Sequence, residues 1–293
     1  MTSVKKAVIP AAGLGTRVLP ASKAMPKEML SIVDKPAIQY IVEEAAASGI
    51  EDILIIISKG KNVIEDHFDR SFELESKLLA AKKEEMYYKV KKISELANIY
   101  YVRQQEMKGL GHAVYCAKSF VGKDPFAVLY GDDVIINDEG KPASLQLCEA
   151  YDKYQKCVVG IKEVTSEQIL SYSSLKVEKL EEKIYKVLDM IEKPTPDKVL
   201  SNFSILGRCV LDGSVFNLLE NLPAGRNGEI QLTDAMAIMA RSSGMIGVNY
   251  DGIRYDMGNK LEILKAMVEV GMQHHEVGES FTKYLKNKFQ QNT

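Results

Sequence analysis

The chain has 293 residues, of which 46% are hydrophobic and 27% charged, and its formal net charge is -2. A chain of this length buries about three quarters of its unfolded surface, so it can fold without disulfides or a structural metal ion. The nearly neutral charge argues against a nucleic-acid-binding protein held by bulk positive charge.

Membrane insertion and secretion are not expected either. No run approaches the roughly 18 apolar residues of a membrane-spanning helix. The apolar stretch near the amino end is interrupted by Pro10 and Arg17 before it resembles a signal peptide. The 4 cysteines show no CxxC pairing and no metal-ligand spacing with the 4 histidines, which indicates buried thiols in a reducing cytosol. We therefore expect a cytoplasmic protein without a membrane or nucleic-acid partner.

Short β-branched runs alternate with helical stretches, which is the pattern of an α/β sheet. Strands are expected at residues 7–9, 53–57, 99–102, 126–130, 157–164 and 204–211. Helices are expected at residues 36–49, 110–120, 145–154 and 230–242, the first opened by a proline and closed by a glycine. Residues 174–177 and 184–191 flank Glu-Glu-Lys and predict a β-hairpin.

Two further segments are helical in pattern. Residues 72–97 are rich in Lys and Glu, which predicts a helical insertion on the outside of the sheet. From Asn259 onward the chain reads as helix, with Gly271 and Gly278 as possible breaks. We therefore expect one main domain over residues 1–258 and a C-terminal helical tail over residues 259–293.

The amino end carries the first functional signal, a glycine loop with unopposed cations. The first strand leads into AAGLGTR at residues 11–17, and residues 1–27 hold five Lys or Arg and no Asp or Glu. Successive loop N–H groups form a concavity for anions, which nearby cations reinforce. The loop has no Walker A pattern, and Val18 stands where a dinucleotide fingerprint needs its third glycine. This combination predicts a site for a nucleoside triphosphate.

Carboxylates form the second signal. Gly131-Asp132-Asp133 follows a predicted buried strand, and open α/β sheets bind ligands at this edge. Because side chains alternate along a strand, we expect only one of the two aspartates to face the ligand. Asp256, before a glycine at a helix start, is a candidate second metal ligand. Carboxylate and phosphate oxygens are the ligands that Mg²⁺ prefers, so Mg²⁺ is the expected cofactor. An ordinary polar turn after a strand would give the same sequence pattern.

The end of the predicted hairpin carries the third signal. There Glu192 would accept hydrogen bonds from sugar hydroxyls and Lys193 would contact a phosphate, although Glu-Lys pairs are also common on surfaces. His112 is expected at a helix start, and His274 and His275 are expected to be solvated. The sequence offers no convincing nucleophile, so covalent catalysis is not favoured.

Taken in order, these segments resemble the bacterial UTP–glucose-1-phosphate uridylyltransferases, within the wider sugar-nucleotide pyrophosphorylase family. The resemblance covers nearly the whole chain. Its matching stretches are AAGLGTRVLPASKAMPKEML (11–30), IVDKPAIQYIVEEAAASGI (32–50), HFDRSFELE (67–75), VRQQEMKGLGHAV (102–114), GDD (131–133), IEKP (191–194) and GEIQLTDA (228–235). The HFDRSFELE insertion and KGLGHAV are similar to the uridylyl branch.

The resemblance implies a Rossmann-like α/β fold, with a mixed, mostly parallel β-sheet flanked by helices (the nucleotide-diphospho-sugar transferase fold). It implies that residues 1–258 are the nucleotidyltransferase catalytic domain and that the chain assembles as a homodimer or homotetramer. The implied reaction is UTP plus glucose 1-phosphate giving UDP-glucose and pyrophosphate, by direct in-line attack with Mg²⁺.

The resemblance also implies roles for individual residues. The implied catalytic residues are Arg17, Lys27, Asp132 and Lys193. The implied nucleotide-binding residues are Ala11, Ala12, Gly13, Gly15, Glu28, Gln104 and Gly109. The implied sugar-binding residues are Gly131, Ser173, Glu192, Lys193 and Gly207. The implied metal ligands are Asp132 and Asp256.

One departure bears on the sugar. Many relatives carry Tyr-Gly where this chain has Tyr172-Ser173, and a serine there could narrow the hexose pocket. One alternative is therefore the same chemistry with another sugar 1-phosphate, or with dTTP. Another is a non-catalytic paralogue that binds nucleotide sugar and regulates a partner, although such a protein would have no use for the metal carboxylates.

Overall fold

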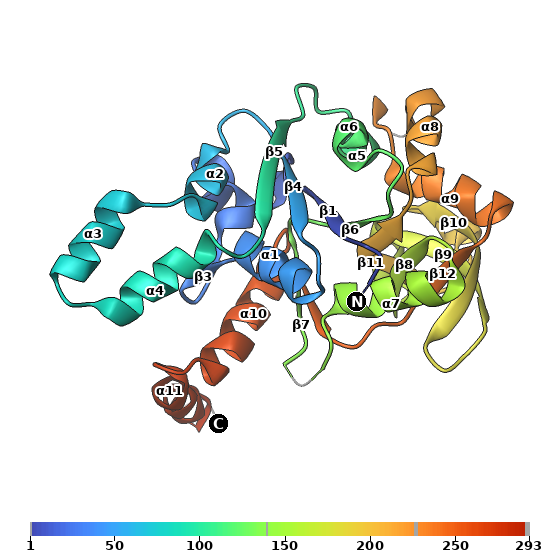
Figure 1. Ribbon diagram of the computed structural model, residues 1–293. Helices are drawn as coiled ribbons and strands as arrows, with labels where there is room; N and C mark the ends of the chain where they lie inside the picture. Colours follow the sequence, from blue (N-terminus) through green and yellow to red (C-terminus); the bar gives the residue numbers. More distant parts are fainter. Residues whose placement is uncertain (1, 139, 226–227, 291–293) are drawn as a thin grey trace.

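The computed structural model describes residues 2–138, 140–225 and 228–290. A nine-stranded sheet crosses the molecule (Figure 1). Its strands, in spatial order, are β5 (Asn98–Arg103), β4 (Asp52–Ile57), β1 (Lys6–Pro10), β6 (Phe126–Leu129), β11 (Phe203–Leu211), β8 (Val158–Glu163), β12 (Met245–Val248), β10 (Ile184–Glu192) and β9 (Ser173–Lys179).

The directions of these strands confirm a mixed, mostly parallel sheet. Strands β5, β4, β1 and β6 are parallel to one another. Strand β11 is antiparallel to both β6 and β8, and β12 is parallel to β8. Strand β10 is antiparallel to both β12 and β9, which completes the expected hairpin. Only β10 and β11 therefore run against the other strands of this nine-stranded sheet.

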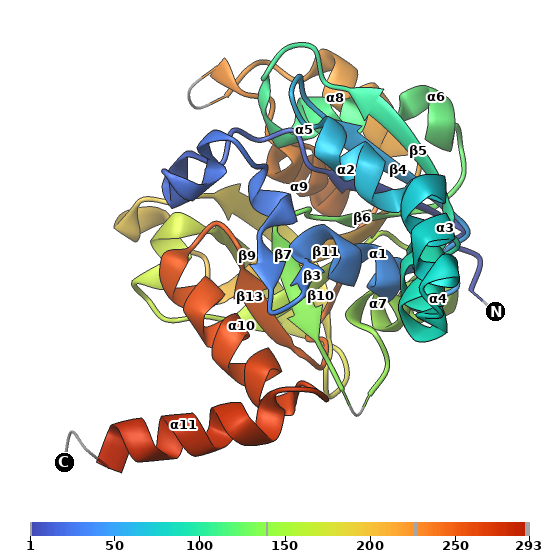
Figure 2. The same ribbon diagram turned by 90° about the vertical axis from the view of Figure 1, so that its left-hand side faces the viewer.

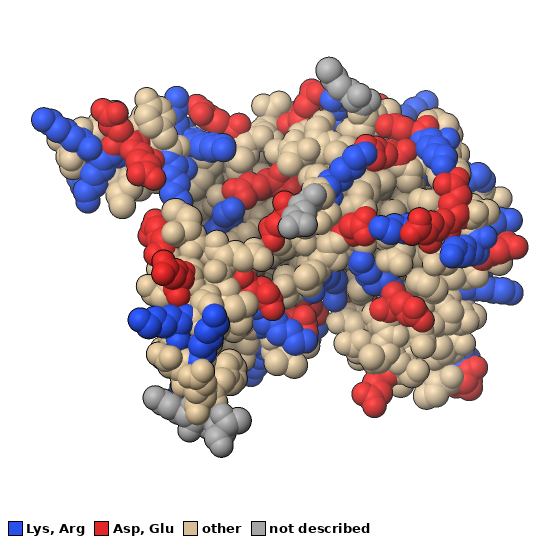
Figure 3. Space-filling model, turned by 90° about the horizontal axis from the view of Figure 1, so that it is seen from below, with Lys and Arg blue, Asp and Glu red and all other residues tan. Residues whose placement is uncertain are grey.

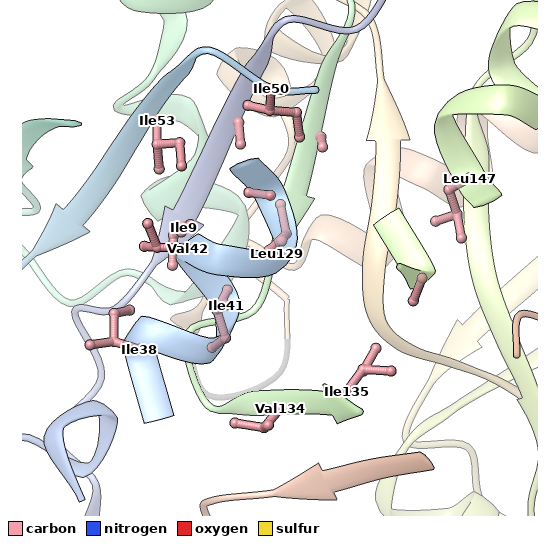
Figure 4. Packing of buried hydrophobic residues seen from close by; sticks show 14 of the residues in the cluster. Ile9, Ile38, Ile41, Val42, Ile50, Ile53, Leu129, Val134, Ile135 and Leu147 are labelled. Carbon is pink, nitrogen blue, oxygen red and sulfur yellow. The ribbon is translucent and has the colours of Figure 1, made fainter. Parts of the chain in front are cut away.

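The central strands are almost continuously apolar because the sheet is covered on both faces. Strand β4, with the sequence DILIII, is buried from Ile53 to Ile57. Neighbouring residues of β1 point to opposite faces, so that Ile9 belongs to one hydrophobic cluster and Val8 to the other. In Figure 4, Ile38, Ile41 and Val42 of the covering helix lie beside Ile9.

Helices supply the outer layers on each face. The cluster around Ile9 receives side chains from α1 (Ala37–Ala47), α2 (Asn62–Phe68), α7 (Ala143–Tyr154) and α10 (Lys260–Gln273). The cluster around Val8 receives side chains from α5 (Gly109–Tyr115), α6 (Lys118–Val121), α8 (Ser214–Asn221) and α9 (Leu232–Ser242).

Short elements that the sequence did not predict shape the loops. Strands β7 (Asp133–Ile136) and β13 (Ile253–Asp256) pair antiparallel, and Asp133 lies opposite Asp256. The other short elements are β2 (Ser31–Ile32), β3 (Lys35–Pro36), η1 (Thr16–Val18), η2 (Ala21–Lys23), η3 (Lys27–Met29), η4 (Gln168–Ser171) and η5 (Pro196–Lys198).

Two helical arms project from the body (Figures 1 and 2). The first is α3 (Phe72–Ala80) with α4 (Glu84–Ile93), within the expected insertion. The second is α11 (Gly278–Gln290), which packs against α10, while α10 itself packs on β13 and β2. Basic and acidic side chains are interspersed over the face seen in Figure 3. The domain boundary at residue 258 stays a prediction.

Several expected helix limits were wrong. The helix expected over 110–120 is broken at Cys116 between α5 and α6, which leaves this thiol only partly buried. Helix α9 begins at Leu232 rather than Ile230, because the Ile230 carbonyl accepts the N–H of Gly111 (2.8 Å). Gly271 lies inside α10, where a Cβ would come within 3.0 Å of the Phe281 ring on α11.

The expectation for His274 was also wrong. Its side chain is only 10% exposed, and its Nε2 lies 3.4 Å from Asp34 Oδ1 at the turn between β2 and β3. His274 directly follows α10, and the neighbouring His275 is 70% exposed.

Candidate active site

A cleft of about 910 Å³ opens where β1 and β6 end, and its lining includes six of the sixteen predicted site residues. This is the carboxyl edge of the parallel strands, where open α/β sheets bind ligands. The lining residues are Arg17, Leu110, Tyr130, Asp132, Asp133, Leu170, Ser171, Tyr172, Ser173, Glu192, Lys193, Ile205, Glu229, Gln231, Thr233, Asp234, Arg254 and Asp256.

The glycine loop after β1 leads to Arg17, which is the residue of this segment that lines the cleft. Its first residue stays in the sheet, since Ala11 donates its N–H to the Ile56 carbonyl (2.8 Å). Gly15 adopts φ +68°, and its carbonyl accepts the Ser22 hydroxyl (2.6 Å), which folds the loop onto η2. A Cβ on Gly13 would meet nothing within 4 Å, so this part of the loop faces open space. The geometry leaves room for a ligand against the backbone.

Glu28 lies beneath this loop rather than in the cleft lining. Its Oε2 accepts a hydrogen bond from Lys61 Nζ (2.8 Å), and Lys61 also donates to the Ala11 carbonyl. Both residues are buried, which raises the pKa of Glu28 and lowers the pKa of Lys61. The pair anchors Ala11 from below. Lys61 was not predicted, because a single lysine after a glycine gives no sequence signal.

Two cations and two carboxylates meet at the floor of the cleft. Lys27 Nζ donates to Asp132 Oδ2, and Arg17 Nη2 lies 3.6 Å from the same oxygen. Arg17 Nη1 donates to Asp256 Oδ2 at 3.1 Å. Burial favours the neutral form of Asp132, but the charges of Lys27 and Arg17 hold its pKa below the ordinary value. Asp132 is therefore ionised at neutral pH.

Asp133 has a different partner, but the expectation that only one of the two aspartates faces the ligand was wrong: both line the cleft, because Asp132 lies in the turn before β7 and side-chain alternation does not apply there. Its Oδ1 lies 2.6 Å from Arg254 Nη2, and its side chain is 3% exposed against 20% for Asp132. Burial, together with the charges of Asp132 and Asp256, raises the pKa of Asp133 to about 6 despite Arg254. Of the two aspartates, Asp132 is the one paired with the predicted phosphate-binding cations.

The donor set fits Mg²⁺ held jointly by protein and nucleotide. Asp132 and Asp256 approach one guanidinium, that of Arg17, and the Met257 N–H donates to the Asp132 carbonyl (2.8 Å). Among the residues that the structure describes, no group of three or more His, Cys, Asp or Glu side chains forms a complete metal site. Two carboxylates leave the remaining coordination positions of Mg²⁺ to phosphate oxygens and water, as is usual for this ion.

The predicted sugar-binding residues lie across the cleft. Glu192 Oε2 accepts the Thr233 hydroxyl (2.8 Å). Lys193 has φ +44°, and its N–H donates to the Tyr172 carbonyl (2.8 Å). The Ser173 side chain is turned toward β11, where its Oγ accepts the Ile205 N–H at 3.2 Å.

Two glycines that were predicted to bind the sugar, Gly131 and Gly207, lie where another segment of the same chain comes very close. A Cβ on Gly131 would be 2.7 Å from the Pro10 carbonyl oxygen. Gly207 has φ +71°, and a Cβ there would collide with the Asp133 carboxylate. Neither glycine lines the cleft. Gly131 allows the close approach of Pro10, and Gly207 allows the close approach of Asp133, which does line the cleft.

Gln104 and Gly109 are brought together next to Leu110 of the lining. Gln104 Nε2 donates to the Gly109 carbonyl (3.1 Å) and lies 3.0 Å from His112 Nδ1. Gly109 has φ +90°, and a Cβ there would be 2.8 Å from Glu229 Cβ. His112 lies in the first turn of α5, as expected.

The model of the nucleotidyl transferase family matches residues 6–273. UTP–glucose-1-phosphate uridylyltransferase YngB of Bacillus subtilis is 49% identical over 99% of this chain and 97% of its own length. The chain belongs to this family of uridylyltransferases. A second relative of that name from Bacillus subtilis is 46% identical over 98% of this chain and 97% of its own length.

Solved structures lead to the same family. A UDP-glucose pyrophosphorylase complexed with UDP-glucose is 40% identical, with a TM-score of 0.83 over 90% of this chain and 97% of that chain. A UTP-bound enzyme of this kind from Acinetobacter baumannii is 38% identical, with a TM-score of 0.90 over 96% and 98%. The predicted family, fold class and nucleotidyltransferase activity are thus confirmed.

Within this uridylyltransferase, sequence reasoning missed Arg254, Tyr172 and Thr233, which line the cleft. Arg254 had a usable signal, because it precedes the predicted ligand Asp256 by two positions on one short strand. Thr233 lies in the matching stretch 228–235 and Tyr172 directly precedes Ser173, but nothing in the sequence showed that these two side chains reach the cleft. In the described parts of the chain, no helix is long and apolar enough to cross a bilayer.

Proposed function

We propose that the chain transfers UMP from UTP to glucose 1-phosphate and releases pyrophosphate, giving UDP-glucose. One observation carries this proposal. The same cleft holds Arg17, the carboxylates Asp132 and Asp256, and the pair Glu192 and Lys193. The related enzymes with bound UTP and bound UDP-glucose support the choice of both substrates.

The chemistry needs alignment and charge stabilisation rather than a base. An oxygen of the sugar phosphate attacks the α-phosphorus of UTP, and the bond to pyrophosphate breaks on the opposite side. The attacking phosphate is already ionised at neutral pH, so no proton has to be removed. The protein must hold two anions that repel each other in line, and it must stabilise charge at the α-phosphorus.

The cations on the cleft floor are suited to this task. Lys27 donates to Asp132 and Arg17 donates to Asp256, and both cations would contact phosphate oxygens when UTP binds. Arg17 would then contact the departing β- and γ-phosphates, with Lys27 nearby on the triphosphate. Asp132 and Asp256 would hold Mg²⁺, which neutralises phosphate charge when bound.

The remaining residues orient the two substrates. The backbone of Ala11, Ala12, Gly13 and Gly15 would contact the nucleotide, while Gln104 and Gly109 would recognise the uracil edge. Glu192 would accept hydrogen bonds from hexose hydroxyls, and Lys193 would contact the sugar phosphate. Ser173 lines the cleft, and its Oγ accepts the Ile205 N–H, so this hydroxyl is partly committed to β11.

Assembly and location are part of the proposal. Large apolar side chains such as Phe72, Tyr88 and Tyr284 are exposed on the two arms and suit an interface between copies in a homodimer or homotetramer. The four cysteines are free thiols, and burial raises the pKa of Cys148 and of Cys157 to about 12, which suits a reducing cytoplasm. Light scattering after gel filtration measures the assembly directly.

Pyrophosphate release across a panel of nucleotides and sugar phosphates tests the reaction. With Mg²⁺, UTP and glucose 1-phosphate should turn over at least about tenfold more efficiently than dTTP or N-acetylglucosamine 1-phosphate. A preference for another pair would reassign the substrates. Binding of nucleotide sugar without any turnover would favour the non-catalytic alternative.

A further inference from the structure

Arg254 occupies an unusual place between the two halves of the cleft. It lies on β13 two residues before Asp256, and its side chain is only 14% exposed. Its Nη2 lies 2.6 Å from Asp133 Oδ1 and 3.9 Å from Asp256 Oδ2. One end of the guanidinium is therefore fixed among the carboxylates of the cleft floor.

The other end of the guanidinium contacts Tyr172 on the sugar side. Arg254 Nη1 donates to the Tyr172 hydroxyl at 3.4 Å, and the guanidinium carbon lies 5.2 Å from the centre of the tyrosine ring. A guanidinium carries its donors on separate nitrogens, so Nη2 can reach Asp133 while Nη1 reaches Tyr172, whereas the donors of an ammonium all lie on one atom. Both contacts use the geometry that distinguishes arginine from lysine.

Tyr172 in turn fixes the backbone of Lys193. The Tyr172 carbonyl accepts the Lys193 N–H at 2.8 Å, directly after the paired residues Ser173 and Glu192. Lys193 has φ +44°, a conformation that a non-glycine residue keeps only where its surroundings hold it. The hydrogen bond from Lys193 to Tyr172 is such a constraint.

This arrangement leaves one polar atom of Arg254 unpaired. Among the described residues, Arg254 Nε is the only buried side-chain nitrogen or oxygen without a hydrogen-bond partner. Buried polar atoms are normally paired, because an unpaired one loses its hydration without compensation. The position of the side chain thus provides partners for Nη1 and Nη2 but not for Nε. This indicates that the position serves a role other than stability.

We propose that Arg254 and Tyr172 are positioning residues that couple the carboxylates on the cleft floor to Lys193. This inference rests on the proposed function, in which those carboxylates serve the nucleotide side and Lys193 serves the sugar phosphate. Arg254 holds Asp133 and Tyr172 in fixed relation, and Tyr172 sets where the Lys193 ammonium can reach. This pair, Arg254 and Tyr172, is called the bridge below. The bridge aligns the attacking phosphate with the α-phosphorus.

Removal of one hydroxyl tests the bridge. Tyr172→Phe keeps the ring over Arg254 but loses the hydrogen bond, so the KM for glucose 1-phosphate should rise about three- to tenfold. The KM for UTP should stay within about twofold of the parent value, because the nucleotide side is untouched. The matched control is Tyr115→Phe, whose exposed hydroxyl donates to Glu220 (3.0 Å) outside the cleft.

A double-mutant cycle separates coupling from simple loss of structure. Arg254→Lys keeps the charge but loses the fork, and it should raise the KM for glucose 1-phosphate about tenfold. If both residues act through one link, adding Tyr172→Phe to Arg254→Lys should change that KM by less than about twofold more. The control for the arginine is Arg241→Lys at the exposed pair with Asp189.

The outcomes distinguish this proposal from the proposed function. No turnover of UTP and glucose 1-phosphate by the parent enzyme would count against the function. Calorimetric binding of glucose 1-phosphate in the presence of a non-hydrolysable UTP analogue measures the bridge without turnover. If Tyr172→Phe binds glucose 1-phosphate as tightly as the parent protein, or if the two substitutions act additively, the bridge is wrong. Should Arg254→Lys fail to fold, the Tyr172→Phe measurement alone decides.

Discussion

Lys27 donates a hydrogen bond to the Asp132 carboxylate, across a separation of 105 positions in the sequence. The predicted phosphate-binding ammonium and the predicted metal-binding carboxylate therefore form an ion pair with each other. Arg17 has a similar relation to Asp256 at 3.1 Å. Binding of a triphosphate can draw both cations onto phosphate oxygens and free both carboxylates, so the site exchanges one set of ion pairs for another.

Loss of the Asp132 charge should nearly abolish transfer. Asp132→Asn keeps the shape but removes the anionic oxygen, and we expect activity to fall about a hundred- to a thousandfold at every Mg²⁺ concentration. Pyrophosphate release over a Mg²⁺ titration is the measurement. The matched control is Asp124→Asn at an exposed pair with Lys6, which should leave activity unchanged. Activity within about tenfold of the parent would refute the metal role.

The Lys27–Asp132 pair should also give a pH-dependent stability. The pKa of Asp132 is lowered from its ordinary value of 3.8, so its contribution is present above that value and is lost as pH falls through the lowered one. In metal-free buffer, Asp132→Asn should lower the unfolding free energy by about 1–3 kcal/mol at pH 7.

Urea unfolding of both proteins at steps from pH 7 downward checks this dependence. The difference between them should stay constant until the pH approaches 3.8 and should shrink below it, because Asp132 then binds a proton more readily in the unfolded chain than in the folded one; it is lost once the pH is also below the lowered pKa of the folded protein. A difference that grows as the pH falls would mean that the carboxylate is held neutral in the folded protein.

Lys193 should act on the sugar phosphate and not on the nucleotide. Lys193→Ala removes an ammonium at the cleft, and we expect the KM for glucose 1-phosphate to rise about ten- to a hundredfold. Steady-state kinetics with each substrate varied in turn provide the test. Lys183→Ala, at an exposed pair with Asp251, is the control. A rise confined to the KM for UTP would show that the assignment is wrong.

A buried ion pair behind the cleft should carry much of the stability of this region. Arg208 lies 2.6 Å from Glu44 and also donates to the carbonyls of Gly207 and Asp133. Glu44→Gln leaves a buried guanidinium without its counter-charge, and we expect a loss of about 3–5 kcal/mol in unfolding free energy.

Urea denaturation measures this loss against an exposed pair. Glu220→Gln removes the partner of Lys118 at the surface and should cost less than about 1 kcal/mol. A similarly small loss for Glu44→Gln would show that the buried pair does not hold the Gly207 and Asp133 backbone in place.

Eight of the nine strands of the main sheet could be predicted because their signals are local, whereas the four-residue strand β12 (Met245–Val248) was missed. Runs such as Ile53–Ile57 are β-branched and buried on both faces, and the glycine loop after β1 stands out by its own composition. The pairing of Asp133 with Asp256 could not be predicted, since it joins two four-residue strands that are distant in the sequence. The burial of Lys61 and Arg254 likewise depends on partners that only the fold brings near.

Phosphorus NMR of the purified chain with UTP, glucose 1-phosphate and Mg²⁺ tests the central claim most directly. We predict that the resonances of UDP-glucose and pyrophosphate grow together at equal rates, and that an excess of chelator stops both. Formation of UMP with pyrophosphate in place of UDP-glucose, or unchanged substrate signals with Mg²⁺ present, would contradict the assignment of uridylyl transfer to this cleft.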